Sequence, residues 1–246
     1  MENASSIVLS NAVALNRSLG TIANNIANAS TPGYRAQRVI FEEFLQDVGD
    51  NQDNFEQVND YGQFLINRQG QTERTGNTFD VAIFGEGFFA VQAQGGTQYT
   101  RAGNFEINDE GQLVTPSGNP VLNDGNAPIL IPPNAQNITI TELGDIGSDQ
   151  GIIGRIGVFE FNNVQALRPA GNNLYALEEG FAGPQEATDS RVRQGFVERS
   201  NVNAVLEIGR LIQTSRDFVN SQRLLGDEDD RIRQAIQRLG DTTPLS

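Results

Sequence analysis

The side chains that could carry chemistry in this sequence are carboxylates, tyrosines, hydroxyls and arginines. The chain has 246 residues and contains no cysteine, histidine or lysine. Without cysteine or histidine it lacks the usual zinc ligands and nucleophile–base pairs, and without lysine it lacks a Schiff-base amine and the lysine of a phosphate loop. A pair of carboxylates, as in glycosidases, stays possible. We expect no catalytic site, no cofactor and no metal.

Two adjacent acid pairs, Glu42/Glu43 and Glu178/Glu179, could in principle act as proton donor and acceptor. Nothing near them in the sequence indicates a pocket, and the absence of tryptophan leaves few aromatic platforms for a sugar. The acidic run at 227–230 lacks the glycine and the terminal glutamate of a calcium loop, so it predicts a solvated helix start.

The charge of the chain is strongly negative and unevenly distributed. Its net charge is −14, which argues against binding to a nucleic-acid backbone. Residues 1–190 hold eight arginines against 23 acids, whereas residues 191–246 hold nine arginines against eight acids. A soluble acidic protein accounts for this pattern. A sharper reading is an arginine-bearing tail that meets acidic surfaces on neighbouring molecules.

Residues 4–29 predict a helix with one narrow apolar row. The apolar positions follow one another in steps of three and four, the heptad spacing of a helix that packs against other helices; they are Val8, Ala12, Leu15, Leu19, Ile22, Ile26 and Ala29. Asparagines at 24, 25 and 28 crowd the end of this helix, and Thr31-Pro32-Gly33 stops it. Their amides could cap the helix end or reach backbone groups of packed neighbours.

Residues 76–185 predict an all-β domain of sandwich or barrel type. Short β-rich runs lie at 79–92, 97–122, 127–140 and 155–163, separated by glycine- and asparagine-containing turns. Gly85-Glu86-Gly87, between two such runs, predicts a hairpin.

A second long helix is predicted from about residue 202, and it has two neighbouring rows. One row has heptad steps and contains Val205, Ile208, Ile212 and Val219. The other repeats every seven residues and consists of Leu211, Phe218, Leu225, Ile232 and Leu239. The run GDEDD at 226–230 could kink this helix or start a new one. Because the two end helices, paired with each other, would still leave one row exposed, we expect self-association.

The predicted fold class is therefore α+β, with N- and C-terminal heptad helices in a coiled-coil-like module and a central all-β domain. Residues 1–34 and 200–246 would form a discontinuous assembly domain, residues 76–185 a β-rich domain, and residues 35–75 and 186–199 connecting regions. No apolar run approaches the length of a membrane span, and no secretory signal peptide is visible, so we expect neither membrane insertion nor cleavage of a leader.

Three segments resemble flagellar axial proteins. Ala23-Asn24-Asn25-Ile26-Ala27-Asn28, followed by Thr31-Pro32-Gly33-Tyr34, resembles their N-terminal signature. Residues 194–218, with Ser200-Asn201-Val202-Asn203 at their centre, resemble the C-terminal counterpart, and residues 75–92 and 99–122 resemble the middle of the rod and hook branch. The chain is identified as a member of the flagellar basal-body rod and hook family, most similar to its proximal-rod members, with a distal-rod member as the alternative.

The resemblance implies a structural, non-enzymatic role. Family members leave the cytoplasm unfolded through the flagellar export apparatus and assemble in the periplasm as a helical shaft. Its partners are the inner-membrane ring base and other rod proteins. The terminal helices would form the inner tube. Val8, Leu15, Leu19, Ile22 and Ile26 of the first helix and both rows of the second, together with Asn24, Asn25, Asn28, Asn201 and Asn203, would serve self-assembly. The alternatives are a carboxylate enzyme acting on a polysaccharide and an adaptor that docks once without polymerising.

Overall fold

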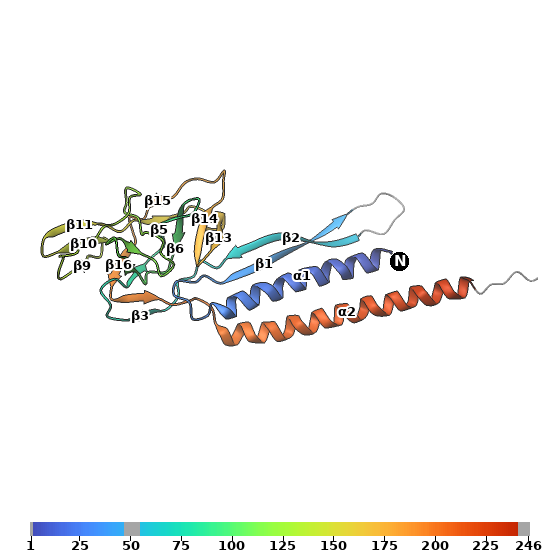
Figure 1. The fold of residues 1–246 in the computed structure, drawn as a ribbon. Helices are drawn as coiled ribbons and strands as arrows, with labels where there is room; N and C mark the ends of the chain where they lie inside the picture. Colours follow the sequence, from blue (N-terminus) through green and yellow to red (C-terminus); the bar gives the residue numbers. More distant parts are fainter. Residues whose placement is uncertain (1, 47–54, 241–246) are drawn as a thin grey trace, which may run out of the picture. The chain divides into compact units, whose positions relative to one another are not determined.

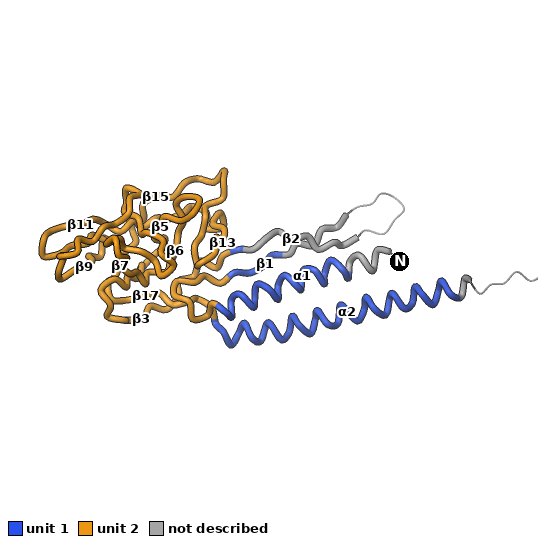
Figure 2. The backbone as a smooth tube through the Cα atoms, viewed as in Figure 1, with its two compact units in different colours: residues 1–27, 37–64, 203–246 blue, residues 28–36, 65–202 orange. Residues whose placement is uncertain are grey.

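The computed structural model describes the backbone of residues 2–46 and 55–240, and the side chains of residues 8–40 and 64–237. The chain forms two compact units (Figure 2). The helical unit consists of residues 1–27, 37–64 and 203–246, and the β unit consists of residues 28–36 and 65–202. The α+β class predicted from the sequence is confirmed.

The helical unit contains two long helices and a pair of strands. Helix α1 (Glu2–Ala27) lies alongside helix α2 (Ala204–Gly240), and strand β1 (Gln37–Gln46) lies beside α1 and pairs with β2 (Phe55–Leu65) (Figure 1). These strands occupy much of the segment 35–75 that we expected to be a connection. Its many Asp, Asn and Gln residues hid the β-formers of 37–46, which include Val39, Ile40 and Phe41.

Helix α2 runs without interruption through residues 226–230, so the break predicted there is wrong. Two ion pairs along the helix support this segment, Glu228 with Arg231 and Asp229 with Arg233. The helix starts at a cap: the Asn203 side chain accepts a hydrogen bond from the Leu206 amide at 3.1 Å. Among the described residues, neither helix has the apolar length that a membrane crossing needs.

The β unit is built from many short strands. Their bounds are β3 (Thr72–Arg74), β4 (Val81–Phe84), β5 (Phe88–Ala93), β6 (Gly96–Thr100), β7 (Glu106–Ile107), β8 (Leu113–Val114), β9 (Thr139–Ile140), β10 (Asp145–Ser148), β11 (Gly151–Arg155), β12 (Val158–Glu160), β13 (Leu167–Gly171), β14 (Leu174–Leu177), β15 (Gln185–Glu186), β16 (Arg191–Gln194) and β17 (Phe196–Glu198). A single 3₁₀ turn (Val164–Ala166) precedes β13.

The strands of the β unit form one six-stranded sheet and several small ones. The large sheet has the order β13-β14-β6-β5-β12-β15, and a second sheet has the order β11-β10-β9. The pairs β16-β4, β17-β3 and β7-β8 complete the set among the described residues. The hairpin predicted at Gly85-Glu86-Gly87 is wrong, because β4 pairs with β16 whereas β5 pairs with β6 and β12. The two glycines, at φ of 117° and 125°, let the chain leave one sheet and enter another.

The core of the β unit lies on both faces of β5. Phe89 and Val91 point into one cluster with Val81, Leu113 and Ile156, while Phe88 and Ala90 point into the other. Alternation along the strand produces this division. Phe88 meets Tyr175 and Phe161 edge to face, with ring centroids 5.9 Å apart in each pair. This packed core positions the ends of β4, β6 and β17, where a cluster of buried polar side chains lies.

Candidate functional site

The apolar row expected on α1 is partly covered in the single chain. Val8, Leu15, Leu19, Ile22 and Ile26 are all half-buried, and Ala12 is buried. Leu9 and Val13, which lie beside this row, are exposed.

The two rows on α2 differ in exposure. Leu211, Phe218, Leu225 and Ile232 are half-buried; the side chain of Leu239 lies outside the described residues. The other row is open to solvent, with exposed fractions of 79% for Val205, 46% for Ile208, 49% for Ile212 and 42% for Val219. On α2, the half-buried row therefore faces the rest of the helical unit, whereas no described residue covers the Val205–Val219 row.

Asn25 has a partner within its own chain. Its amide nitrogen donates to the Gln37 carbonyl at 2.8 Å, and its amide oxygen accepts from the Gln37 amide at 3.0 Å. The side chain is 1% exposed. An amide can donate and accept at once, so this pair fixes the start of β1 against α1. Asn24 is exposed on the same helix.

Asn28 and Asn201 act within the β unit. Asn28 accepts hydrogen bonds from the Thr31 hydroxyl and, through its carbonyl, from the Thr31 amide, which closes the turn after α1. Asn201 accepts from the Ala36 amide at 2.7 Å and donates to the carbonyls of Ile66 and Arg68, both at 2.8 Å. The Asn201 amide donates to the carbonyl of Tyr34. One asparagine therefore joins three chain segments, at 34–36, 66–68 and 201.

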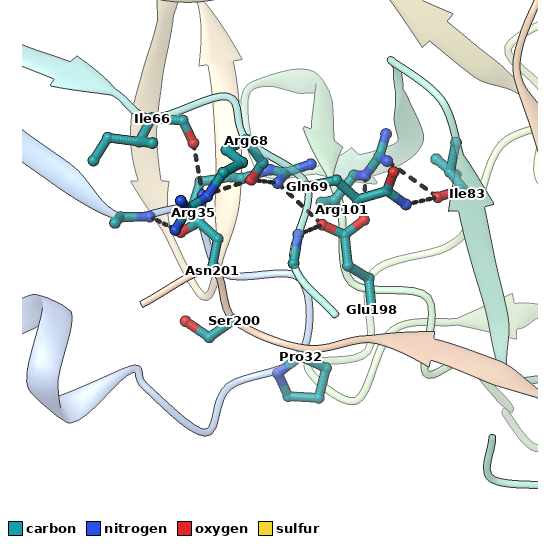
Figure 3. Close-up of polar contacts among 12 residues, drawn as sticks. Pro32, Arg35, Ile66, Arg68, Gln69, Ile83, Arg101, Glu198, Ser200 and Asn201 are labelled. Carbon is teal, nitrogen blue, oxygen red and sulfur yellow. Dashed lines mark hydrogen bonds and ion pairs between the residues drawn. The ribbon is translucent and has the colours of Figure 1, made fainter. Parts of the chain in front are cut away.

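A buried ion cluster lies beside Asn201 and belongs wholly to the β unit (Figure 3). Glu198 receives Arg35 Nη1 at 3.0 Å on one carboxylate oxygen and Arg101 Nε at 2.6 Å on the other. The three side chains are 1–2% exposed. The Gly70 amide also donates to Glu198, at 2.8 Å. A carboxylate removed from water needs such partners to remain charged.

The two arginines of the cluster also bind backbone carbonyls. Arg101 donates to the carbonyls of Ile83, Gly85 and Gly87, so it holds the chain where it passes from β4 to β5. Arg35 donates to the carbonyl of Arg68. Burial lowers the pKa of the Arg35 guanidinium to about 10, against the opposing effect of the Glu198 charge. Arg35 therefore stays charged at neutral pH, at a cost in free energy that Glu198 partly offsets.

Gly33 permits the close approach that the cluster needs. Its φ is +67°, and a Cβ there would lie 2.2 Å from the Ala102 amide nitrogen. Its own amide donates to the Glu198 carbonyl at 2.7 Å. Any larger residue would both strain the turn and displace Arg101. The Thr-Pro-Gly sequence is thus more than the end of a helix, because it docks the chain against the β unit.

Of the acids considered for catalysis or for metal binding, Glu178, Glu228 and Asp229 have partners in the structure, and Glu179 is exposed. Glu178 pairs with Arg168 at 2.9 Å, and both are well exposed. Glu228 and Asp229 form the ion pairs of α2. The side chains of Glu42 and Glu43 lie outside the described residues.

Sequence reasoning missed Arg35, Arg101 and Glu198. Their separations along the chain are 66 and 97 residues, and single charged residues in polar stretches read as solvent-exposed. The available signal was their position, since Arg35 follows the Thr-Pro-Gly-Tyr segment and Glu198 precedes Ser200-Asn201.

Three family models match the chain. Residues 11–35 match the model described as flagella basal body rod protein, and residues 82–148 match the flagellar hook protein FlgE/F/G D1 domain. Residues 193–238 match the flagellar basal body rod FlgEFG protein C-terminal model. The matched ranges include Asn24, Asn25, Asn28, Arg35 and Asn201.

The chain is similar over nearly its whole length to proteins called flagellar basal-body rod protein FlgF. It is 37% identical to the one from Caulobacter vibrioides and 35% identical to the one from Mesorhizobium japonicum, covering 98% of this chain and 99% of the relative in each case. It is also 32% identical to the flagellar basal-body rod protein FlgG of Bacillus subtilis, over 89% of this chain and 92% of the relative.

Proposed function

This chain belongs to the family of flagellar basal-body rod proteins, and from that premise we propose that it is a non-enzymatic structural subunit of the proximal rod. Higher identity and fuller coverage favour the FlgF-named relatives over those named FlgG. In this role the subunit joins others in a helical shaft that transmits torque toward the distal rod and hook.

The observation that carries this proposal is the uncovered row of α2. Val205, Ile208, Ile212 and Val219 recur at heptad spacing and are exposed, while the neighbouring row on the same helix is half-buried. Exposed apolar side chains at this spacing are typical of a helix that packs against another helix. The helices α1 and α2 of one subunit then act as a coiled-coil-like pair, and the open row receives a helix of the next subunit.

Assembly through this row has a defined symmetry. A row on one subunit that meets a different surface on the next makes a heterologous contact, which builds an open helix when the rotation between subunits does not close a ring. Close side-chain packing along the row makes the shaft stiff, because packed interiors resist compression. Stiffness is what a torque-bearing shaft requires.

The setting of the protein follows from the same proposal. The subunit passes the flagellar export apparatus without a cleaved signal peptide and assembles in the periplasm. There it contacts the ring base and the other rod proteins. No nucleic acid, membrane insertion or cofactor belongs to this role.

The proposal is tested by charging the open row. The double variant I208D/I212D places two carboxylates at exposed positions, so the purified protein should keep its helix content and lose no more than about 1 kcal/mol of unfolding free energy. In cells that lack the natural copy, it should fail to restore swimming and be absent from isolated basal bodies.

The control variant is N220D/Q234D, which adds the same charge to exposed positions of α2 outside the row. It should swim normally. Normal swimming and normal incorporation of I208D/I212D would contradict the proposed role of the row.

A further inference from the structure

Three arginines of the β unit gather around two phenylalanines on its surface. Arg193 stacks on both rings, with its guanidinium carbon 4.5 Å from the Phe84 centroid and 5.4 Å from the Phe196 centroid. Arg191 lies opposite Phe84 in the β16–β4 pair, and Arg74 lies opposite Phe196 in the β17–β3 pair. Side chains opposite each other in a ladder share a face. These five residues form what we name the basic patch.

The arginines of the basic patch have no carboxylate partner among the described residues. The side chains of Arg74 and Arg193 form neither hydrogen bonds nor ion pairs with described residues, and the Arg191 side chain donates only to the carbonyls of Thr188 and Ser190. Elsewhere in the β unit, exposed arginines such as Arg155, Arg168 and Arg199 pair with acids.

The guanidinium groups of the basic patch thus keep N–H donors available in a chain with 31 acids. Stacking on two rings holds the Arg193 fork in place while leaving its N–H donors available, which lowers the entropy lost on binding a carboxylate. The chemistry of the basic patch therefore fits an acidic surface that also has apolar area for the two rings.

The β unit carries a surface of this complementary kind. A hollow of about 540 Å³ is lined by the apolar residues Phe79, Ile107, Ile131 and Pro132 and by the acids Asp109 and Glu110. Both carboxylates are exposed, and neither forms an ion pair with a described residue. We name these six residues the acidic hollow.

The basic patch and the acidic hollow lie on different sides of the same strand. Gln194, next to Arg193 in β16, donates to the carbonyls of Thr78 and Ile138, and both residues line the hollow. Successive side chains of a strand point to opposite faces. One β unit can therefore use both surfaces at once.

We propose that the basic patch of one subunit binds the acidic hollow of a second copy of this chain, so that β units join head to tail. This inference rests on the proposed function and adds to it a second contact, independent of the helices. Because the two surfaces differ, the contact is heterologous and continues from copy to copy. Because the charges are exposed, the contact weakens as salt rises.

The test is sedimentation of the purified full chain at about 20 mM and about 500 mM salt. The wild type should associate at low salt and dissociate at high salt. The variants R74E/R193E and D109R/E110R should each bind themselves at least about tenfold more weakly, because like charges then face each other. A control, R155E/R168E, has the same charge change as the first variant outside the patch and should associate like the wild type.

Mixing the two charge-reversed variants is the most direct test of the contact. An equimolar mixture of R74E/R193E and D109R/E110R restores opposite charges in both orientations, so association should return to the mixture although neither variant associates alone. Thermal melting of each variant checks that the fold is intact. Failure of the mixture, or identical association of wild type and R74E/R193E, would overturn the inference.

Two further outcomes separate this inference from the proposed function. A wild type that stays monomeric at low salt, yet enters basal bodies, overturns the head-to-tail contact and leaves the rod assignment standing. If R74E/R193E abolishes swimming without changing self-association, the patch serves a different acidic partner and the second-copy proposal fails.

Discussion

Glu198 is a carboxylate with two guanidinium partners and almost no access to water. Replacing it by glutamine keeps the size of the side chain and an acceptor for the Gly70 amide, but leaves Arg35 and Arg101 buried without a counter-charge. Loss of one partner from a buried ion cluster costs about 3–5 kcal/mol. We expect E198Q to lose that much unfolding free energy. The measurement is urea unfolding, monitored by the near-ultraviolet circular dichroism of the tyrosines.

The matched control is E178Q, which removes an exposed carboxylate from its pair with Arg168. Exposed pairs contribute about 0–1 kcal/mol, so this variant should unfold almost like the wild type. Equal stability of E198Q and E178Q would mean that water or a shifted backbone satisfies the arginines.

Ionisation of the single residue Tyr175 should make the unfolding free energy depend on pH. Burial raises the pKa of its hydroxyl well above the usual value of about 10. In the unfolded chain the group ionises near pH 10, so the unfolded state binds fewer protons above that pH. The unfolding free energy should then fall as pH rises above 10, by up to about 1.4 kcal/mol per pH unit from this group.

The measurement compares the wild type with Y175F between about pH 9 and 11. The variant should lose less stability over that range. The lowered pKa of Arg35 acts in the opposite direction, and because the charges of Arg35 and Tyr175 interact, its effect cancels only in part in the difference. Parallel pH profiles would show that Tyr175 ionises in the folded protein.

At the scale of elements, the sequence predicted the helices better than the strands between them. Seven-residue spacing is a long signal, so both helices were located within two residues at their inner ends. The same spacing does not predict which of the two adjacent rows on α2 packs against the rest of the helical unit. On the half-buried side of α2, polar Thr214 and Ser221 lie between Leu211, Phe218 and Leu225, so apolar content did not identify this row as the covered one.

The pairing of β4 with β16 depends on contacts between residues far apart in the sequence, which a local sequence pattern does not reveal. The two runs around Gly85-Glu86-Gly87 looked like a hairpin because a short glycine turn joined them. Arg101 instead binds three carbonyls of that segment and the chain changes sheets there. The partner strand β16 lies more than 100 residues away in the sequence, so only tertiary structure reveals the pairing.

At the scale of the molecule, the two units should differ in local stability. The β unit has residues with no exposed surface, such as Val81, Phe89 and Val91, whereas no described side chain of α2 is less than 7% exposed. Amides protected by a closed core open only with global unfolding, while sparsely covered helices open locally. In dilute protein, hydrogen exchange should be slowest around residues 81–91 and faster along α2.

Assembly gives the control for that experiment. In isolated basal bodies, the α2 amides should become protected to a degree near that of the β core. Slow exchange along α2 already in the monomer would mean that the helix needs no neighbour, contrary to the proposed role of its open row.

One hydrogen bond has a consequence for how long this chain needs to be. The Ile66 amide donates to the Ala36 carbonyl at 2.9 Å, so the two ends of the segment 37–64 leave the β unit as neighbours. A segment that starts and finishes at one place can be shortened, extended or exchanged without moving the chain on either side. Residues 37–64 are thus an insertion, hereafter the cassette, whose two ends meet at one point of the β unit. Related subunits could differ in this cassette and still share the same buried Arg35–Glu198–Arg101 cluster.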